Sequence, residues 1–263
     1  MKKTLVIVFM STLLLIMFTG CGEKDVLQEV QDNGKLVVGI SPDYPPFGFI
    51  QMVDGKDKVV GYEPMIAEEI AKELGVELVF KQMDFDGVIP ALQAGEIDIA
   101  MSGLTPTEDR KKVVDFSDLL YSGNQSFLVH QADAAQYQSV DDLKGKVVGV
   151  QLGSIQQELA ETVGAKEIKK LKDLGSLVRL LVNKEIDAIV ISELSGKEYS
   201  KTNADVLLAP VVFESATEEG VAVAIPKNNE ALQKIINDVI QQLKDTNKLD
   251  QFFVEAETLV EGE

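Results

Sequence analysis

The chain has 263 residues, 45% of them apolar, so it can bury a sizeable core as one or two domains. Its formal charge is −18, from 43 acidic and 25 basic side chains, which repels nucleic acid and anionic lipid head groups. We therefore expect no nucleic-acid partner, and the single cysteine excludes a disulfide within the chain.

Residues 1–20 are typical of a secretory signal peptide. Lys2 and Lys3 precede an apolar run over 5–18 that is short for a membrane span, and Gly20-Cys21 follows. A lone cysteine here resembles a bacterial lipobox, in which Cys21 is lipidated and becomes the first mature residue. A plain signal peptide with an incidental cysteine is the alternative. The lipobox predicts a chain of charge −20 that is anchored outside the cytoplasmic membrane without spanning it.

The mature chain begins with a polar segment over 21–33, which we interpret as a tether with at most one helical turn. Next comes a β-branched strand over 34–40, whose form returns 111 residues later over 145–150. A second pair, 92–101 and 181–190, has the pattern of a helix end, a turn and a buried strand. One structural plan is therefore used twice.

Helical patterns fill the space between these strands. Residues 64–74 have apolar side chains at helical spacing and end at Gly75, before a strand over 76–80. Residues 156–163 and 174–182 occupy the same place in the second half. Strands alternating with helices predict parallel sheets, and two such units predict two α/β lobes.

The C-terminal strand (221–226) and helix (230–243) have no counterpart in the repeat, so we place them on the first lobe, before a solvated acidic tail. Chain crossings between the lobes then fall near 120–124 and 214–219. The predicted organisation is a signal peptide over 1–20, a tether over 21–33, lobe 1 over 34–122 and 218–263, and lobe 2 over 123–217.

Ligands collect beyond the carboxyl ends of parallel strands, which points to the loops 41–47, 102–110, 151–156 and 192–193. If the lobes face each other, these loops line one cleft. The loop over 102–110 ends at Arg110, one of only two arginines in a chain that otherwise uses lysine. Arginine is favoured where a planar cation grips a carboxylate at two points. A surface cation that balances Glu108 and Asp109 is the other interpretation.

Two of these loops lead into helices, whose free N–H groups could hold a carboxylate together with Arg110. Thr105 and Glu108 fit a capping box, although Thr107 is a rival cap that would leave the Thr105 hydroxyl free. Tyr44 and Phe85 are candidate apolar walls of the cleft or, alternatively, core residues.

The segments Tyr44-Pro45-Pro46-Phe47 and 98–112, which runs on to 115–117, resemble bacterial solute-binding proteins of family 3, the polar amino-acid receptors of ABC importers. The similarity runs over about 35–253. It implies a two-lobed, type II periplasmic-binding-protein fold with two hinge crossings and an interlobe ligand cleft. It also implies a monomer without cofactor or metal that delivers a free amino acid to a membrane permease.

The resemblance also implies roles for individual residues. Arg110 matches the arginine that pairs with the ligand α-carboxylate, and Gly103 matches a carbonyl that receives the ammonium. Tyr44 and Phe85 match the aromatic pair around the ligand side chain. The expected ligand-binding residues are Ser41, Tyr44, Phe85, Ser102, Gly103, Thr105, Arg110, Gln151, Ser154, Ile155, Gln156, Ser192 and Glu193.

Two positions depart from the family pattern. Ser41 replaces an acidic residue of many relatives, which argues against a cationic ligand. Ser192, with Glu193 one place later, replaces the acidic residue that usually meets the ammonium. The ammonium anchor is then either Glu193 after a local shift or the Gly103 carbonyl with the Thr105 and Ser192 hydroxyls.

Other functions are possible on this fold. A dehydratase would need Glu193 or Asp43 as its acid, and the sequence offers no metal cluster and no nucleophile with a base. The single histidine, His130, lies in a strand-like run and is predicted to be structural. An amino-acid sensor or adhesin lipoprotein is a further alternative. The leading hypothesis is a receptor for a polar, non-cationic amino acid.

Overall fold

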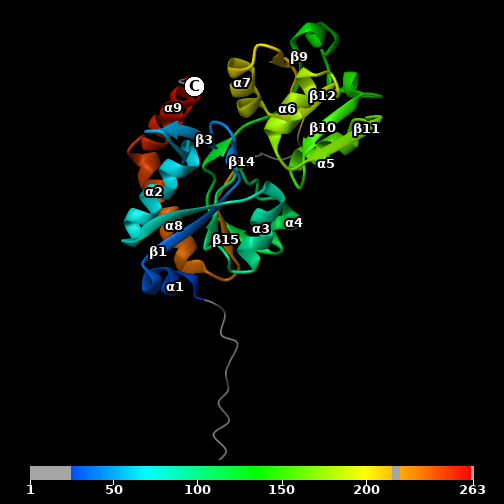
Figure 1. Cartoon of the computed structure of the whole chain (residues 1–263). Helices are drawn as coiled ribbons and strands as arrows, with labels where there is room; N and C mark the ends of the chain where they lie inside the picture. Colours follow the sequence, from blue (N-terminus) through cyan, green and yellow to red (C-terminus); the bar gives the residue numbers. More distant parts are fainter. Residues whose placement is uncertain (1–24, 215–219, 262–263) are drawn as a thin grey trace, which may run out of the picture.

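The computed structural model describes residues 25–214 and 220–261. Figure 1 shows two lobes, each built around its own sheet, with β14 at the junction between them. This mixed α/β arrangement confirms the predicted two-lobed fold class. The predicted signal peptide and Cys21 lie outside the described residues. No helix within the described residues has the length and apolar character needed to cross a bilayer.

The first sheet contains β1, which pairs in parallel with β5 and β6, whereas β15 runs antiparallel to β6 and β7. Its strands in spatial order are β5 (Glu77–Gln82), β1 (Lys35–Ile40), β6 (Ile99–Ala100), β15 (Ala224–Pro226) and β7 (Val114–Phe116). The C-terminal strand β15 therefore lies inside the first-lobe sheet, between β6 and β7.

The second sheet repeats this plan. Strand β10 pairs in parallel with β11 and β12, and β9 runs antiparallel to β12 and β13. The spatial order is β11 (Glu167–Leu171), β10 (Val147–Gln151), β12 (Ala188–Ser192), β9 (Gln125–His130) and β13 (Val206–Leu208). Both sheets are thus mixed rather than parallel, because the strands that follow the crossings, β9 and β15, run against their neighbours.

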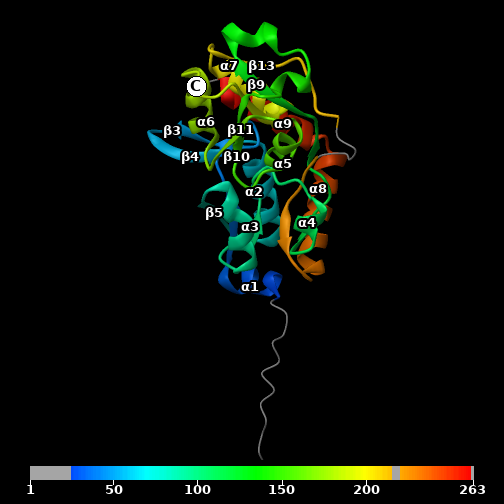
Figure 2. The same ribbon diagram turned by 90° about the vertical axis from the view of Figure 1, so that its right-hand side faces the viewer.

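Helices cover both faces of each sheet, so the central strands are apolar on both sides. In the first lobe α1, α2, α8 and α9 pack on one face and α3 on the other, and in the second lobe α5 and α6 take opposite faces (Figure 2). The helices are α1 (Val26–Asn33), α2 (Tyr62–Leu74), α3 (Phe85–Gln93), α4 (Glu108–Lys111), α5 (Ile155–Thr162), α6 (Leu174–Val182), α7 (Glu193–Thr202), α8 (Glu230–Asp245) and α9 (Lys248–Glu261), with short 3-10 helices η1 (Gln131–Gln136) and η2 (Val140–Leu143).

Both ends of the described chain differ from the prediction. Residues 26–33 of the predicted tether form α1, in which Val26 and Val30 are buried against the first lobe. Much of the predicted solvated tail belongs to α9, which buries Ala256 and Val260. Apolar side chains at helical spacing explain both results, because each helix gains stability by covering the core.

A small sheet was not predicted. It contains β2 (Asp43–Tyr44), β3 (Gly48–Val53) and β4 (Lys56–Val60). Strands β3 and β4 form a hairpin whose turn residues, Asp54 and Gly55, have φ values of 54° and 75°. An Asp-Gly pair is a standard signal for this turn, so the sequence did contain the information.

The lobes join at a two-stranded ribbon. Strand β8 (Tyr121–Ser122) pairs antiparallel with β14 (Gly220–Val221). The predicted first crossing, near 120–124, contains β8, whereas most of the second lies outside the described residues. The exact lobe boundaries given above stay a prediction.

Candidate ligand-binding site

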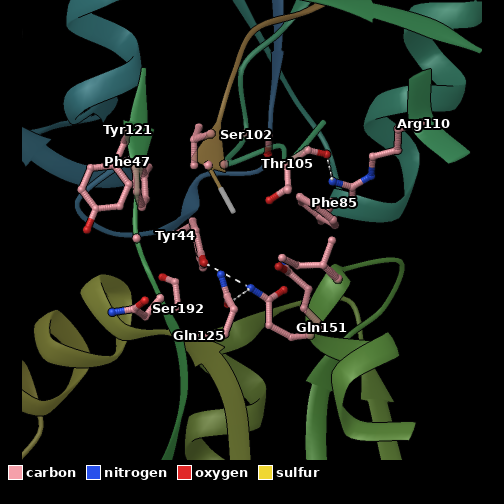
Figure 3. Close-up of a pocket in the computed structure, with 17 residues that line it drawn as sticks. Tyr44, Phe47, Phe85, Ser102, Thr105, Arg110, Tyr121, Gln125, Gln151 and Ser192 are labelled. Atoms are coloured by element: carbon pink, nitrogen blue, oxygen red, sulfur yellow. Dashed lines mark hydrogen bonds between the residues drawn. The ribbon is translucent and has the colours of Figure 1, made fainter. Parts of the chain in front are cut away.

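A pocket lies between the lobes, lined by residues of both. Figure 3 shows Arg110, Phe85 and Thr105 on one side of it and Gln125, Gln151 and Ser192 on the other. The lining residues are Tyr44, Phe47, Phe85, Ser102, Gly103, Thr105, Arg110, Tyr121, Gly123, Asn124, Gln125, Gln151, Ile155, Gln156, Ser192, Gly220 and Val221.

The strand ends place these side chains. Ser102 and Gly103 follow β6 in the first lobe, while Gln151 and Ser192 end β10 and β12 in the second. In both sheets the parallel strands point their carboxyl ends toward the gap, which is where open α/β sheets bind ligands.

Arg110 is the only charged residue among the described residues that line the pocket. Its guanidinium donates from Nη1 to the Thr105 carbonyl at 3.0 Å and from Nη2 across the gap to the Gly153 carbonyl at 3.1 Å. It also lies 5.6 Å from the centre of the Phe85 ring, a cation–π contact. Arg110 forms none of the ion pairs found among the described residues. The alternative interpretation, a surface pairing with Glu108 and Asp109, is wrong, because those carboxylates bind Lys111 and Lys112.

Burial lowers the pKa of the Arg110 guanidinium to about 10, although the negative charge of Glu158 acts in the opposite direction. Arg110 therefore remains charged at neutral pH. A cation that has lost water and gained only neutral carbonyl partners is prepared to receive an anionic group.

Thr107, and not Thr105, caps the short helix that carries Arg110. The Thr107 hydroxyl accepts from the Arg110 backbone N–H at 3.2 Å. Thr105 lines the pocket instead, so the capping-box alternative is wrong and its hydroxyl is left for other contacts.

Tyr44 forms an aromatic wall between the two sides of the pocket. It stacks on Phe47 with ring centres 5.5 Å apart, and its ring covers Gly103. Gly103 has a φ of 62°, and a Cβ there would lie 2.7 Å from the Tyr44 ring. Only glycine fits both the turn and this close approach. Burial raises the pKa of the Tyr44 hydroxyl to about 12, so it stays protonated.

The first-lobe loop at Gly103 is held by the buried carboxyl group of Glu63. The Gly103 N–H donates to both oxygens of Glu63 at 3.0 Å. Glu63, at the start of α2, is 1% exposed, and burial raises its pKa to about 8 despite this hydrogen bond. Glu63 thus fixes the loop that presents the Gly103 carbonyl.

The second lobe contributes neutral amides. Gln156 donates from Nε2 to Gln125 Oε1 at 2.7 Å, and its contact with the Tyr44 hydroxyl is longer, at 3.5 Å. Ser192 lies at the pocket floor, where its hydroxyl accepts from the Ser195 N–H and caps α7. The second-lobe residues that the structure describes at the pocket are therefore mostly polar and carry no formal charge.

Ten of the thirteen predicted ligand residues line the pocket, and Ser41, Ser154 and Glu193 do not. Ser154 caps α5, because its hydroxyl accepts from the Gln157 N–H. Glu193 pairs with Lys197 at 2.9 Å and accepts from Asn124 at 3.1 Å. These partners hold the Glu193 carboxylate, and lower its pKa, outside the pocket.

Ser41 lies behind the pocket. Its N–H donates to the Ser102 hydroxyl at 3.0 Å, and its own hydroxyl donates to Asp43 at 2.9 Å. It therefore supports the loop rather than lining the pocket.

The sequence missed seven lining residues. Five of them, Tyr121, Gly123, Asn124, Gly220 and Val221, belong to or adjoin the hinge ribbon. The predicted crossing near 120–124 pointed to part of this segment without assigning it to the site. Phe47 lies within the recognised Tyr-Pro-Pro-Phe segment, and Gln125 begins β9. Within the described residues, no cluster of three or more His, Cys, Asp or Glu side chains could hold a metal ion.

Relatives of known binding activity cover nearly the whole chain. The arginine-binding extracellular protein ArtP of Bacillus subtilis is 34% identical over 254 residues, 95% of this chain and 96% of the relative. The L-cystine-binding protein TcyJ of Escherichia coli is 34% identical over 84% of this chain and 82% of its own length.

Solved structures of amino-acid-binding proteins have the same fold as this chain. An amino acid ABC transporter substrate-binding protein of Streptococcus pneumoniae bound to L-arginine has a TM-score of 0.86 at 36% identity, covering 89% of this chain and 98% of that one. The ancestral amino-acid-binding protein AncCDT-1, a precursor of cyclohexadienyl dehydratase, has a TM-score of 0.79 at 33% identity, covering 87% and 98%. The family model for bacterial extracellular solute-binding proteins, family 3, matches residues 36–255. The chain therefore belongs to this family.

Proposed function

We propose that this protein captures a polar amino acid with an uncharged side chain between its lobes and presents the closed form to the permease of an ABC importer. The observation that carries the proposal is Arg110, a half-buried cation in the interlobe pocket without a carboxylate partner among the described residues. Relatives named as arginine-, histidine-, cystine- and glutamine-binding proteins support an amino acid as the cargo.

In this proposal the ligand α-carboxylate binds Arg110 and the Thr105 hydroxyl, near the first N–H groups of α5. The ammonium binds the Gly103 carbonyl and the Ser192 hydroxyl. Glu193 is the weaker candidate anchor, because Lys197 and Asn124 already occupy its carboxylate. Tyr44 and Phe85 enclose the ligand side chain.

The pocket charge supports an uncharged side chain. Among the described residues that line it, none is an aspartate or glutamate. The ligand carboxylate would neutralise Arg110, so a lysine or arginine side chain would be buried without a partner, at a cost of several kcal/mol. Micromolar affinity corresponds to a binding free energy of about −8 kcal/mol. This is weaker than the most favourable binding free energy that a ligand of about ten heavy atoms can reach.

Ligand-biased closure about the β8–β14 ribbon completes the mechanism. Lobe 1 comprises 34–122 and 218–263, and lobe 2 comprises 123–217. A lipid on Cys21 keeps the monomeric receptor at the outer side of the cytoplasmic membrane, near its permease. Loss of the protein from the membrane fraction in Cys21→Ser would support the anchor, and unchanged membrane association would contradict it.

Calorimetry of the mature chain against the twenty amino acids tests this function. We expect at least one uncharged polar amino acid to bind with micromolar or tighter affinity. Binding by none of the twenty would contradict the amino-acid assignment. Tightest binding of lysine, arginine, aspartate or glutamate would contradict the uncharged side chain. The dehydratase alternative lacks an aspartate or glutamate among the described residues that line the pocket, and recovery of the ligand chemically unchanged after long incubation would exclude it.

A further inference from the structure

Asp43 lies outside the pocket, in β2, where the two lobes meet. Its Oδ2 accepts from Gln151 Nε2 and from the Leu174 N–H, both at 2.9 Å and both from the second lobe. Its Oδ1 accepts from the Ser41 hydroxyl at 2.9 Å, and its backbone carbonyl accepts from the Tyr199 hydroxyl at 2.8 Å. One residue of the first lobe thus contacts three elements of the second.

Gln151 connects Asp43 to the pocket. Its amide nitrogen has two hydrogens, and both are used, by Asp43 Oδ2 at 2.9 Å and by the Lys172 carbonyl at 3.1 Å. A carbonyl can only accept, so these partners fix which end of the amide is nitrogen. Gln151 is 5% exposed and lines the pocket, and none of the hydrogen bonds found among the described residues uses its Oε1. Gln151 can therefore offer a ligand only an acceptor.

We propose that Asp43 is a specificity-determining positioning residue, which orients the Gln151 amide so that the site selects a ligand side chain with an N–H or O–H donor. The inference rests on the proposed function, in which Gly103 and Ser192 already serve the ligand ammonium. Gln151 Oε1 is then left to accept a hydrogen bond from the side chain of the ligand. The selected class is uncharged amino acids with a side-chain donor, such as glutamine.

A purely structural role for Asp43 makes a different prediction. If Asp43 only fastened the lobes together, its loss would weaken all ligands by the same factor. If it orients Gln151, its loss lets the amide turn, and ligands with and without a donor become more alike. The ratio of two affinities therefore separates the roles, and the affinity for one ligand does not.

The test is calorimetry of the mature chain with L-glutamine and with the γ-methyl ester of L-glutamate, which keeps the side-chain carbonyl but has no side-chain donor. We expect the parent to prefer glutamine about tenfold, the value of one buried hydrogen bond. In Asp43→Ala the preference should fall to about twofold or less. Gln151→Leu should abolish it, and the double variant should show no further change in the ratio.

Two further variants serve as controls. Asp43→Asn keeps an oxygen for Gln151 and Leu174 while its amide can donate to the Ser41 hydroxyl, so it should retain the preference. Glu261→Gln removes an acid that also bridges the lobes, through Lys201 at 3.1 Å, but lies on α9 away from Gln151. It should leave the ratio unchanged. Thermal unfolding checks that each variant is folded.

The outcomes distinguish the claims. Equal weakening of both ligands in Asp43→Ala, with the ratio intact, overturns the positioning role. A parent that binds the ester, glutamate or methionine as tightly as glutamine overturns donor selection. If the tightest amino acid is another one with a side-chain donor, its analogue without that donor replaces the ester. This analogue is the β-methyl ester of L-aspartate for asparagine and the O-methyl ether for serine or threonine. Binding by none of the twenty amino acids contradicts the proposed function itself, and this inference with it.

Discussion

The two lobes share an internal plan and differ where their strands end. In each lobe the first parallel strand has a glycine beneath an isoleucine side chain, Gly39 under Ile97 and Gly149 under Ile186. Each isoleucine lies just before the neighbouring parallel strand, and its side chain packs on the glycine. A Cβ at either glycine would therefore clash with the isoleucine side chain.

A second shared feature fixes the start of the same strands. The N–H of Val37 donates to Asp98 at 2.7 Å, and the N–H of Val147 donates to Asp187, also at 2.7 Å. In the first lobe this hydrogen bond joins segment 34–40 to segment 92–101, and in the second lobe it joins 145–150 to 181–190. The residues that recur in both lobes therefore stabilise the scaffold.

The strand ends carry the differences. The first lobe supplies a cation and aromatic rings, from Arg110, Tyr44 and Phe85, whereas the second supplies the amides of Gln125, Gln151 and Gln156. In the proposed function the first lobe supplies the cation for the ligand carboxylate and the aromatic rings around its side chain. The second lobe supplies the neutral polar groups, with the Gln151 oxygen as the acceptor for a side-chain donor. Duplicated scaffolds can thus divide one recognition task between them.

Removing the cation that the first lobe supplies has the largest expected effect on ligand affinity. Arg110→Ala should weaken the tightest amino acid by at least about 1.5–3 kcal/mol, the value of a hydrogen bond to a charged group, as measured by calorimetry. Arg179→Ala is the matched control, because this other arginine is exposed on α6 and its guanidinium binds Ser176 and Asp173 there. Unchanged affinity in Arg110→Ala would refute its role.

The shared scaffold is tested by stability. Gly39→Ala and Gly149→Ala should each lower the free energy of unfolding by about 1–2 kcal/mol, because the new methyl group overpacks the isoleucine above it. Gly87→Ala is the control, since its Cβ would meet no atom within 4 Å and its helix α3 should gain about 0.5–1 kcal/mol. Denaturant unfolding measures all three, and equal effects at the three glycines would contradict the shared plan.

The role of Glu63, which holds the Gly103 loop of the first lobe, is tested by the pH dependence of the free energy of unfolding. Because burial raises the pKa of Glu63 to about 8, the native state retains a proton that the unfolded chain releases above the ordinary value near 4.5. This contribution to stability is complete at low pH and is lost as pH rises toward 8, by at most about 1.4 kcal/mol per pH unit. Glu63→Gln should remove that slope relative to the parent, with Glu68→Gln on the same helix as charge control. An identical slope in Glu63→Gln and the parent would show that Glu63 does not titrate in this range.

The smallest effect is expected at Glu193, which follows the floor of the second lobe. Its carboxylate is bound to Lys197 and Asn124 outside the pocket. Glu193→Gln should therefore change ligand affinity by less than about 0.5 kcal/mol in calorimetry. A loss of several kcal/mol would instead identify Glu193 as the ammonium anchor.

Local patterns made much of this structure predictable. The repeated glycine-containing strands and the helix that ends at Gly75 could be read directly, because apolar spacing and turn residues act over a few positions. Most of the pocket followed from the rule that ligands bind at strand ends, together with the family resemblance. The docking of α1 was missed because the buried side chains of Val26 and Val30 are too few to stand out in a polar segment.

Contacts between distant residues were beyond the sequence. Asp43 and Leu174 are 131 positions apart, and their hydrogen bond depends on how the lobes meet. Glu193 was a candidate because it follows a strand, but the local pairing with Lys197 directs it elsewhere. Which face of a loop a side chain takes is decided by such tertiary contacts.

The most direct test of the central claim removes the group that Arg110 is proposed to hold. The tightest-binding amino acid and its α-carboxamide, which lacks the carboxylate charge, are compared by calorimetry on the parent chain and on Arg110→Ala. We predict that the parent binds the free acid at least tenfold more tightly and that the variant no longer distinguishes the two. Equal binding of acid and amide by the parent would contradict the account.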